Sequence, residues 1–213
     1  MGFKSLNDAY EHFKSQGGGG SFFSLKDDKD AAVVRFLHGD EDDIDWYIVH
    51  NVEINGKRRH VKCPETSDCP LCKSGDKPKL RVFLQLVDKR DSETKVWERG
   101  QNFIPTLLSF INRYGTLCGQ PIEIERQGKA GDMKTQYLLY ALDKDNKTLD
   151  DLPKRENLVG EDGFILDKSL EDLQQIADGT FTPTQSNQSN QSEKKEEPTK
   201  RRTSEPKSGA DIF

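Results

Sequence analysis

Apolar residues are scarce in this 213-residue sequence. Only 32% of the residues are hydrophobic, and the same share is charged. A typical globular chain is about 45–50% apolar, counting glycine, so we expect part of this chain not to fold on its own. No apolar run approaches the ~18 residues of a membrane span, and the N-terminal stretch MGFKSLNDAYEHFKSQ has no apolar signal segment. The sequence therefore predicts a soluble, cytoplasmic protein without a membrane partner.

Basic residues are outnumbered, but the resulting net charge of −5 is unevenly distributed. Residues 143–181 carry 5 basic and 11 acidic groups, whereas residues 57–99 carry 12 basic and 7 acidic groups. The overall acidic charge is therefore compatible with a local basic face that binds a polyanion.

Cysteine is also rare, and three of the four cysteines lie between residues 63 and 72. In a chain that is not expected to be secreted, this clustering indicates a metal site rather than a disulfide framework. His50, Cys63, Cys69 and Cys72 have the spacing His-x12-Cys-x5-Cys-x2-Cys, and thiolate and imidazole ligands in a tetrahedral array favour Zn²⁺. His60 is a competing fourth ligand. We favour His50, because a ligand from a separate strand would pin the cysteine loop to the rest of the domain.

The cysteine loop, KCPETSDCPLCKSGDKP, has almost no core-forming residues, so its shape would depend on the metal. We therefore expect one structural zinc ion. Four protein ligands would leave no open position for a catalytic water. A redox role for the Cys69–Cys72 pair is an alternative, but no βαβ pattern surrounds it. Cys118 stands apart and is expected to be a small buried hydrophobe.

Alternating apolar residues and turn signals predict a mainly β fold. The Asn55-Gly56 dipeptide predicts a tight hairpin, and Pro105 and Gly115 delimit one helix. The expected strands are residues 31–37, 45–54, 57–61, 79–88, 95–99, 121–126 and 135–142. The succession of strands, helix and two further strands resembles the order of an OB-fold, a five-stranded barrel with a helix between its third and fourth strands, here with an inserted zinc-binding loop.

The composition divides the chain into five parts. Four consecutive glycines cannot hold a helix and are typical of a flexible joint, and the Gln-, Ser- and Lys-rich end is typical of disorder. The expected parts are an N-terminal amphipathic helix in residues 1–16, a glycine linker in 17–20, the zinc-bearing OB-fold in 21–142, an acidic region with a short helix near 169–177 in 143–181, and a disordered tail in 182–213.

Two strands of the expected barrel carry aromatic rings between cations. Phe83 follows Arg81 on the face that points away from the leucines, and Trp97 alternates with Lys95 and Arg99. Bases of single-stranded nucleic acid stack on such rings, at about 1–3 kcal/mol each, while cations meet the phosphates. The alternative is that both rings fill a second core layer. The expected DNA-contacting residues are Tyr47, Lys57, Arg58, Arg59, Lys79, Arg81, Phe83, Lys95, Trp97, Arg99 and Tyr137.

Several stretches resemble the single-stranded DNA-binding replication proteins of tailed bacteriophages. They are FFSLKDDKDAAVVRFL, YIVH, KRRHVKCPETSDCPLC and RVFLQL followed by VWERGQNF. The chain also resembles the helix-destabilising proteins of T-even phages, whose zinc site is His-x12-Cys-x9-Cys-x2-Cys. The four ligands match that motif with a middle loop four residues shorter. The resemblance implies a non-enzymatic protein that coats single-stranded DNA in phage replication, recombination and repair.

The resemblance also implies partners for both ends of the chain. A tail tip formed by Asp211, Ile212 and Phe213 would recruit replication or recombination proteins, and the N-terminal helix would mediate self-association. Because residues 182–213 are nearly neutral, a tail that competes with DNA would have to use the acidic region upstream of them.

Two other functions remain compatible with the sequence. The chain could be a zinc-ribbon adaptor that binds protein rather than DNA. It could also be a metal-dependent nuclease that uses the carboxylates between Asp40 and Asp45, although no His or Lys is arranged near them as a base.

Overall fold

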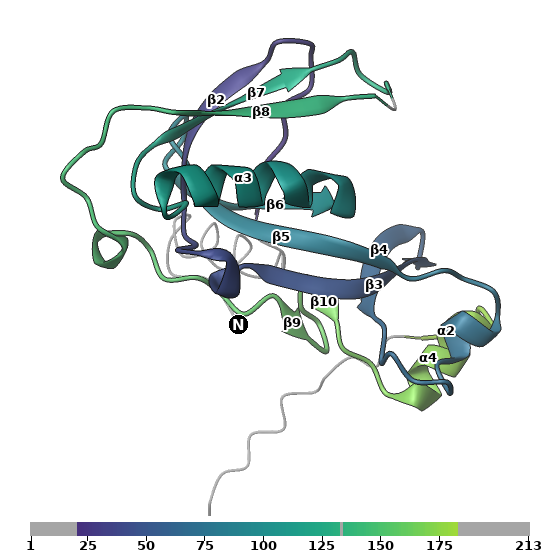
Figure 1. The fold of residues 1–213 in the computed structure, drawn as a ribbon. Coiled ribbons are helices and arrows are strands. Elements are labelled where there is room, and N and C mark those ends of the chain that lie inside the picture. The colour runs from purple at the N-terminus through teal and green to yellow at the C-terminus, as the bar shows by residue number, and fades with distance from the viewer. Residues whose placement is uncertain (1–20, 133, 183–213) are drawn as a thin grey trace, which may run out of the picture. The chain divides into compact units, whose positions relative to one another are not determined.

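The structure is a computed structural model that describes residues 21–132 and 134–182. The expected N-terminal helix, the glycine linker and the tail with its tip lie outside the described residues. The described part is mainly β, with one large mixed sheet and few helices (Figure 1). None of its helices is long and apolar enough to cross a membrane.

The strands are β1 Ser21–Phe22, β2 Ala31–Phe36, β3 Asp45–Ile54, β4 Lys57–Lys62, β5 Lys79–Asp88, β6 Glu93–Gly100, β7 Ile122–Gln127, β8 Gln136–Ala141, β9 Val159–Gly160 and β10 Ile165–Leu166. Strands β2 to β8 are close to those expected from alternation and turn signals, whereas the two-residue strands β1, β9 and β10 were not expected. The α-helices are α2 Pro70–Lys73, α3 Ile104–Tyr114 and α4 Leu170–Ala177, and the 3₁₀ turns are η1 Glu41–Asp43, η2 Gln101–Phe103 and η3 Leu149–Asp151. The predicted β3–β4 hairpin is confirmed, since Asn55 and Gly56 both have positive φ, as a type I′ turn requires.

The strands pair in the order β8-β7-β2-β5-β3-β4-β10-β9. Strand β6 lies off this path and pairs with β5 along the length of that strand. Among the described strands no closed barrel forms, because β6 and β8 do not pair. The outer edge of β6 is occupied instead by β1, which pairs in parallel with Lys95 and Val96. Side chains bridge the opening, since the ring of Tyr137 on β8 lies 5.3 Å from that of Trp97 on β6. The mainly β fold is therefore confirmed, while the described strands form a large mixed sheet rather than a closed barrel.

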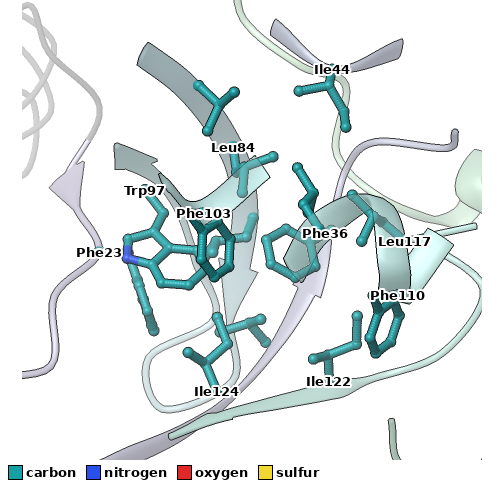
Figure 2. Close-up of a cluster of buried hydrophobic side chains, with 14 of the residues drawn as sticks. Phe23, Phe36, Ile44, Leu84, Trp97, Phe103, Phe110, Leu117, Ile122 and Ile124 are labelled. Carbon is teal, nitrogen blue, oxygen red and sulfur yellow. The ribbon is translucent and has the colours of Figure 1, made fainter. Parts of the chain in front are cut away.

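One hydrophobic core lies between α3 and the concave face of the sheet. Helix α3 begins with Pro105 in its first turn and ends at Gly115, whose φ is 82°, as the sequence predicted. Figure 2 shows Trp97 at one side of this core, beside Phe23 and Phe103. Phe36 also stacks on its indole ring at 6.3 Å.

A second layer covers the opposite face of β5 and is made by residues 144–166. Leu158 and Ile165 pack against Phe83 there, and the Phe164 ring meets the Phe83 ring edge-on at 5.9 Å. The Gln85 side chain exchanges hydrogen bonds of 2.8 Å with the backbone N–H and carbonyl of Glu156. The acidic region thus adds β9, β10 and α4 to the same compact unit, which extends to Phe181.

Removing this layer is expected to unfold the protein. A chain that ends at Asp143 exposes Phe83 and leaves the buried Arg35 guanidinium without Asp145 and without the Lys147 carbonyl. Each loss costs several kcal/mol, because a buried aromatic loses its packing and a buried charge loses its partner. Circular dichroism and thermal unfolding test this. A chain ending at Phe181 is the control, and equal cooperativity of the two chains would contradict it.

Candidate metal centre

His50, Cys63, Cys69 and Cys72 converge in one cluster, with ligand atoms all within 4.8 Å of one another. His50 Nε2 lies 3.5 Å from Cys69 Sγ and 3.6 Å from Cys72 Sγ. Cys63 Sγ lies 3.9 Å and 3.8 Å from the same two sulfurs. A tetrahedral Zn²⁺ with ~2.3 Å Zn–S and ~2.0 Å Zn–N bonds needs sulfurs about 3.8 Å apart and S–N distances of about 3.6 Å. The donor set therefore fits a zinc-type site.

Three local structures supply the four ligands. His50 comes from β3, and Cys63 follows β4, where its N–H donates to the Ile48 carbonyl at 2.9 Å. Cys69 is the N-cap of α2, and Pro70 occupies the first turn of that short helix. A proline fits there because the first helical N–H groups have no partner within the helix. Cys72 lies three residues after Cys69 on the same turn, so the two thiols face each other.

The thiols favour a cation in the cluster. Desolvation and hydrogen bonds with Cys69 and Cys63 raise the pKa of the Cys72 thiol to about 12, and desolvation also raises the pKa of Cys63. The thiolate is the form that binds metal. A cation between the sulfurs would offset this rise in pKa, because metal binding stabilises the thiolates and releases their protons.

An aspartate orients the histidine ligand. Asp76 Oδ2 lies 2.6 Å from His50 Nδ1, which leaves Nε2 directed at the sulfurs. Such a carboxylate fixes the tautomer of a ligating histidine. Asp76 was not predicted from the sequence, although an acidic residue four positions after Cys72 is the available signal. His60, the competing ligand, bonds Glu98 at 3.0 Å instead.

The cluster belongs to a second hydrophobic core. Cys63 and Cys69 pack with Val61, Leu71 and Leu173, and α4 lies against α2 (Figure 1). The half-buried residues Ile48, Val52 and Ile54 of β3 pack against this group. The metal-type cluster therefore joins the outer end of β3 to the C-terminal helix.

The two rings expected to stack on bases are buried. Phe83 and Trp97 are both 0% exposed, so the alternative of core packing is the correct one and the stacking assignment is wrong. Trp97 points into the α3 core and Phe83 into the second layer. The sequence placed both rings on one face, but Trp97 is the register partner of Leu84 and Phe83 that of Glu98, so the rings lie on opposite faces of the sheet and both faces of β5 are covered.

Lys95 is also misassigned as a phosphate contact. It is 8% exposed, and its Nζ lies 2.8 Å from the buried Asp88 and also binds Asp91. Burial opposes ionisation of Asp88, but hydrogen bonds from Arg90 and Lys95 hold the pKa of this carboxyl below its ordinary value. The contribution of Asp88 to stability is therefore present above its unfolded pKa and is lost as the pH falls through the lower folded value.

Other expected contacts already have intramolecular partners. Arg99 lies over the Tyr137 ring at 4.2 Å, Arg59 donates to the Gly163 carbonyl at 2.8 Å, and Arg81 lies 3.3 Å from Glu98. Lys57, Arg58 and Lys79 are exposed and have no ion-pair partner among residues 21–132 and 134–182. These three cations are the ones of the expected set that stay available.

The carboxylates of the nuclease alternative are held by an arginine. Arg155 binds Asp43 Oδ1 and lies 3.2 Å from Asp45 Oδ2. In the described part of the chain the Asp40–Asp45 segment forms no group able to hold a metal. This arrangement is that of a structural ion pair.

No family model matches the sequence, and no curated protein matches it. The fold and the site therefore define the class by themselves. The chain is a mainly β-sheet protein with a buried His-Cys₃ cluster able to hold a metal ion.

Loss of two thiolate ligands is expected to release the metal and destabilise the fold. Replacing Cys69 and Cys72 by Ser should lower the melting temperature markedly, because metal binding supplies folding free energy, about 10–16 kcal/mol in zinc-finger peptides. Metal analysis and thermal unfolding with and without a chelator measure both effects. Cys118→Ser, outside the cluster, should keep the metal. A double variant that melts like the parent would refute a stabilising metal.

Lys95→Ala is expected to cost about 1.5–3 kcal/mol of unfolding free energy, because the buried Asp88 carboxylate loses one charged hydrogen-bond donor while Arg90 stays bound to it. Urea denaturation measures the loss. Lys89→Ala, an exposed change one residue from Asp88, should fall within about 0.5 kcal/mol of the parent. Equal stability of the two variants would mean that the Lys95–Asp88 pair contributes nothing.

Proposed function

We propose that this chain is a sequence-tolerant single-stranded DNA-binding protein built on an OB-fold-like sheet. The observation that carries the proposal is the strand connectivity. β2 and β3 act as one bent first strand that pairs with both β5 and β7. β5 pairs with β6, β7 pairs with β8, and α3 separates β6 from β7. This is the pairing order of an OB-fold, in which the barrel is often partly open.

The position of the metal cluster supports the same function. The cluster is inserted between the first and second strands of this order, and its His-Cys₃ set resembles that of the T-even helix-destabilising proteins. We assign it one structural Zn²⁺, because four protein donors at tetrahedral spacing leave no open coordination position. On this reading the protein is not an enzyme, and it would act in phage DNA replication, recombination and repair.

The proposed DNA surface lies on the outer end of the sheet. Lys62 on β4 and Lys79 on β5 are both register partners of Val49, and Arg81 is the partner of Tyr47. Directly opposed residues share a face of the sheet. Arg58 belongs to the same face, because it lies four positions before Lys62 on β4 and side chains alternate between faces. Because Arg81 is held by Glu98, we leave it out and name the other four residues the β3–β4–β5 patch: Tyr47, Arg58, Lys62 and Lys79.

This patch can serve a phosphate backbone without the buried rings. Arg58 and Lys79 are exposed, and the Lys62–Asp167 pair at 3.5 Å is solvent-accessible, so it is worth little and yields readily. Tyr47, which is half-buried, supplies one ring for stacking. Binding dominated by cations would depend steeply on salt and weakly on sequence.

Charge reversal within the patch tests the proposal. Arg58→Glu combined with Lys79→Glu should weaken binding of a fluorescein-labelled oligo(dT) at least tenfold, because two phosphate contacts are lost. Each lost contact should also lower the magnitude of the salt slope by about one. Fluorescence anisotropy at several salt concentrations measures both quantities.

Lys144→Glu combined with Lys154→Glu is the matched control, with the same change in net charge at exposed positions outside the patch. If both double variants bind like the parent, or if both weaken equally, the patch is not the DNA surface. A parent protein without affinity for oligo(dT) would leave the zinc-ribbon adaptor as the better function.

A further inference from the structure

Strand β8 has an unpaired outer edge. It pairs with β7 alone, and the Leu142 N–H donates to the Pro121 carbonyl on that same side. Because alternate residues of an antiparallel strand bond to the same neighbour, the N–H and C=O groups of Tyr137, Leu139 and Ala141 point to the other side. No hydrogen bond to these groups is present among the described residues.

The edge also lacks the usual protection against a further strand. Edge strands are commonly blocked by a charged side chain, a proline or a bulge, whereas the β8 sequence QYLLYA contains no charge and no proline. Three of the seven exposed large hydrophobic residues in the described chain lie at or beside this edge, namely Tyr114, Tyr140 and Leu142.

A groove of about 470 Å³ runs between this edge and α3. Figure 1 shows α3 extending alongside β8. Helix residues from Pro105 to Tyr114 form one wall, and Leu138, Leu139 and Tyr140 form the other. Nine helical steps span about 13 Å, which is the length of about four residues of extended chain.

The lining defines what the groove can accept. Phe110, Tyr114 and Tyr140 offer apolar and aromatic surface, and Arg113 is the one charged residue in this lining. Arg113 lies 5.6 Å from the Tyr114 ring and has no carboxylate partner in the described part of the chain.

We propose that the β8–α3 groove binds an extended peptide segment of a partner protein by β-strand addition. The peptide backbone pairs with Tyr137, Leu139 and Ala141, its apolar side chains lie on the ring surface, and a carboxylate pairs with Arg113. This site is independent of the β3–β4–β5 patch and does not rest on the proposed DNA function.

Three fluorescein-labelled hexapeptides test the site on the full chain. The first is acidic, Glu-Val-Glu-Val-Glu-Val, the second replaces each Glu by Lys, and the third is the acidic peptide with N-methylated valines, which lack the backbone donors. Fluorescence polarisation measures affinity, and hydrogen exchange measures protection of residues 136–141. The protein variants are Arg113→Glu, with Lys154→Glu as the matched control at an exposed position outside the groove.

The acidic peptide should bind the parent with a Kd below about 1 mM, the weak limit of specific recognition, and should protect β8 from exchange. Arg113→Glu should weaken this binding about tenfold and favour the lysine peptide, whereas Lys154→Glu should change neither. N-methylation should abolish binding.

Absence of saturable binding overturns the proposal. So does binding that Arg113→Glu leaves unchanged, or equal binding of the N-methylated peptide. Arg113 is exposed, so its variant should melt like the parent. Arg58→Glu with Lys79→Glu should bind the acidic peptide normally, which keeps this result separate from the outcome for DNA.

Discussion

The constraint on which this structure depends is that β5 is buried on both faces. Val82, Leu84 and Leu86 point into the α3 core, while Phe83 and Gln85 point the other way and are equally inaccessible, at 0% and 1% exposure. A strand of this kind must lie between two layers. The second layer comes from residues 144–166, so a segment with the composition of an acidic linker is an integral part of the folded unit.

Polar groups fix this second layer as firmly as apolar ones. The buried Arg35 reaches both the Asp145 carboxylate and the Lys147 carbonyl, at 2.8 Å and 2.7 Å. The buried His38 ring contacts the Asp43 carbonyl, and the same carbonyl accepts from Arg155. Displacing residues 144–166 would leave buried polar groups such as Arg35 without partners, at a cost of several kcal/mol. This packing argues against the acidic region as a displaceable competitor for DNA.

Much of this architecture could be predicted from local sequence, because local rules govern it. Alternation located β3 and β5, the Asn55-Gly56 pair located the hairpin, and the spacing of His50 and three cysteines located the metal cluster. Other features depend on contacts between distant segments. Alternation along a strand says on which face of that strand a side chain lies, but not whether another segment covers that face. Phe83 is covered by Phe164 and Trp97 by Phe23, and both partners are distant in the sequence. The two-residue pairing of β1 with β6 has no sequence signal of its own.

The proposed functional surfaces depend on different supports within one unit. The outer half of β3 extends past the α3 core, and its residues Ile48, Val52 and Ile54 pack against the metal-type cluster and α4. The direction of the β3–β4–β5 patch is therefore set by the metal module. The groove along β8 is formed by α3, whose apolar side belongs to the main core. Proteins open locally as well as globally. Loss of the metal should therefore disorder the neighbouring β3–β4–β5 patch more than the β8–α3 groove.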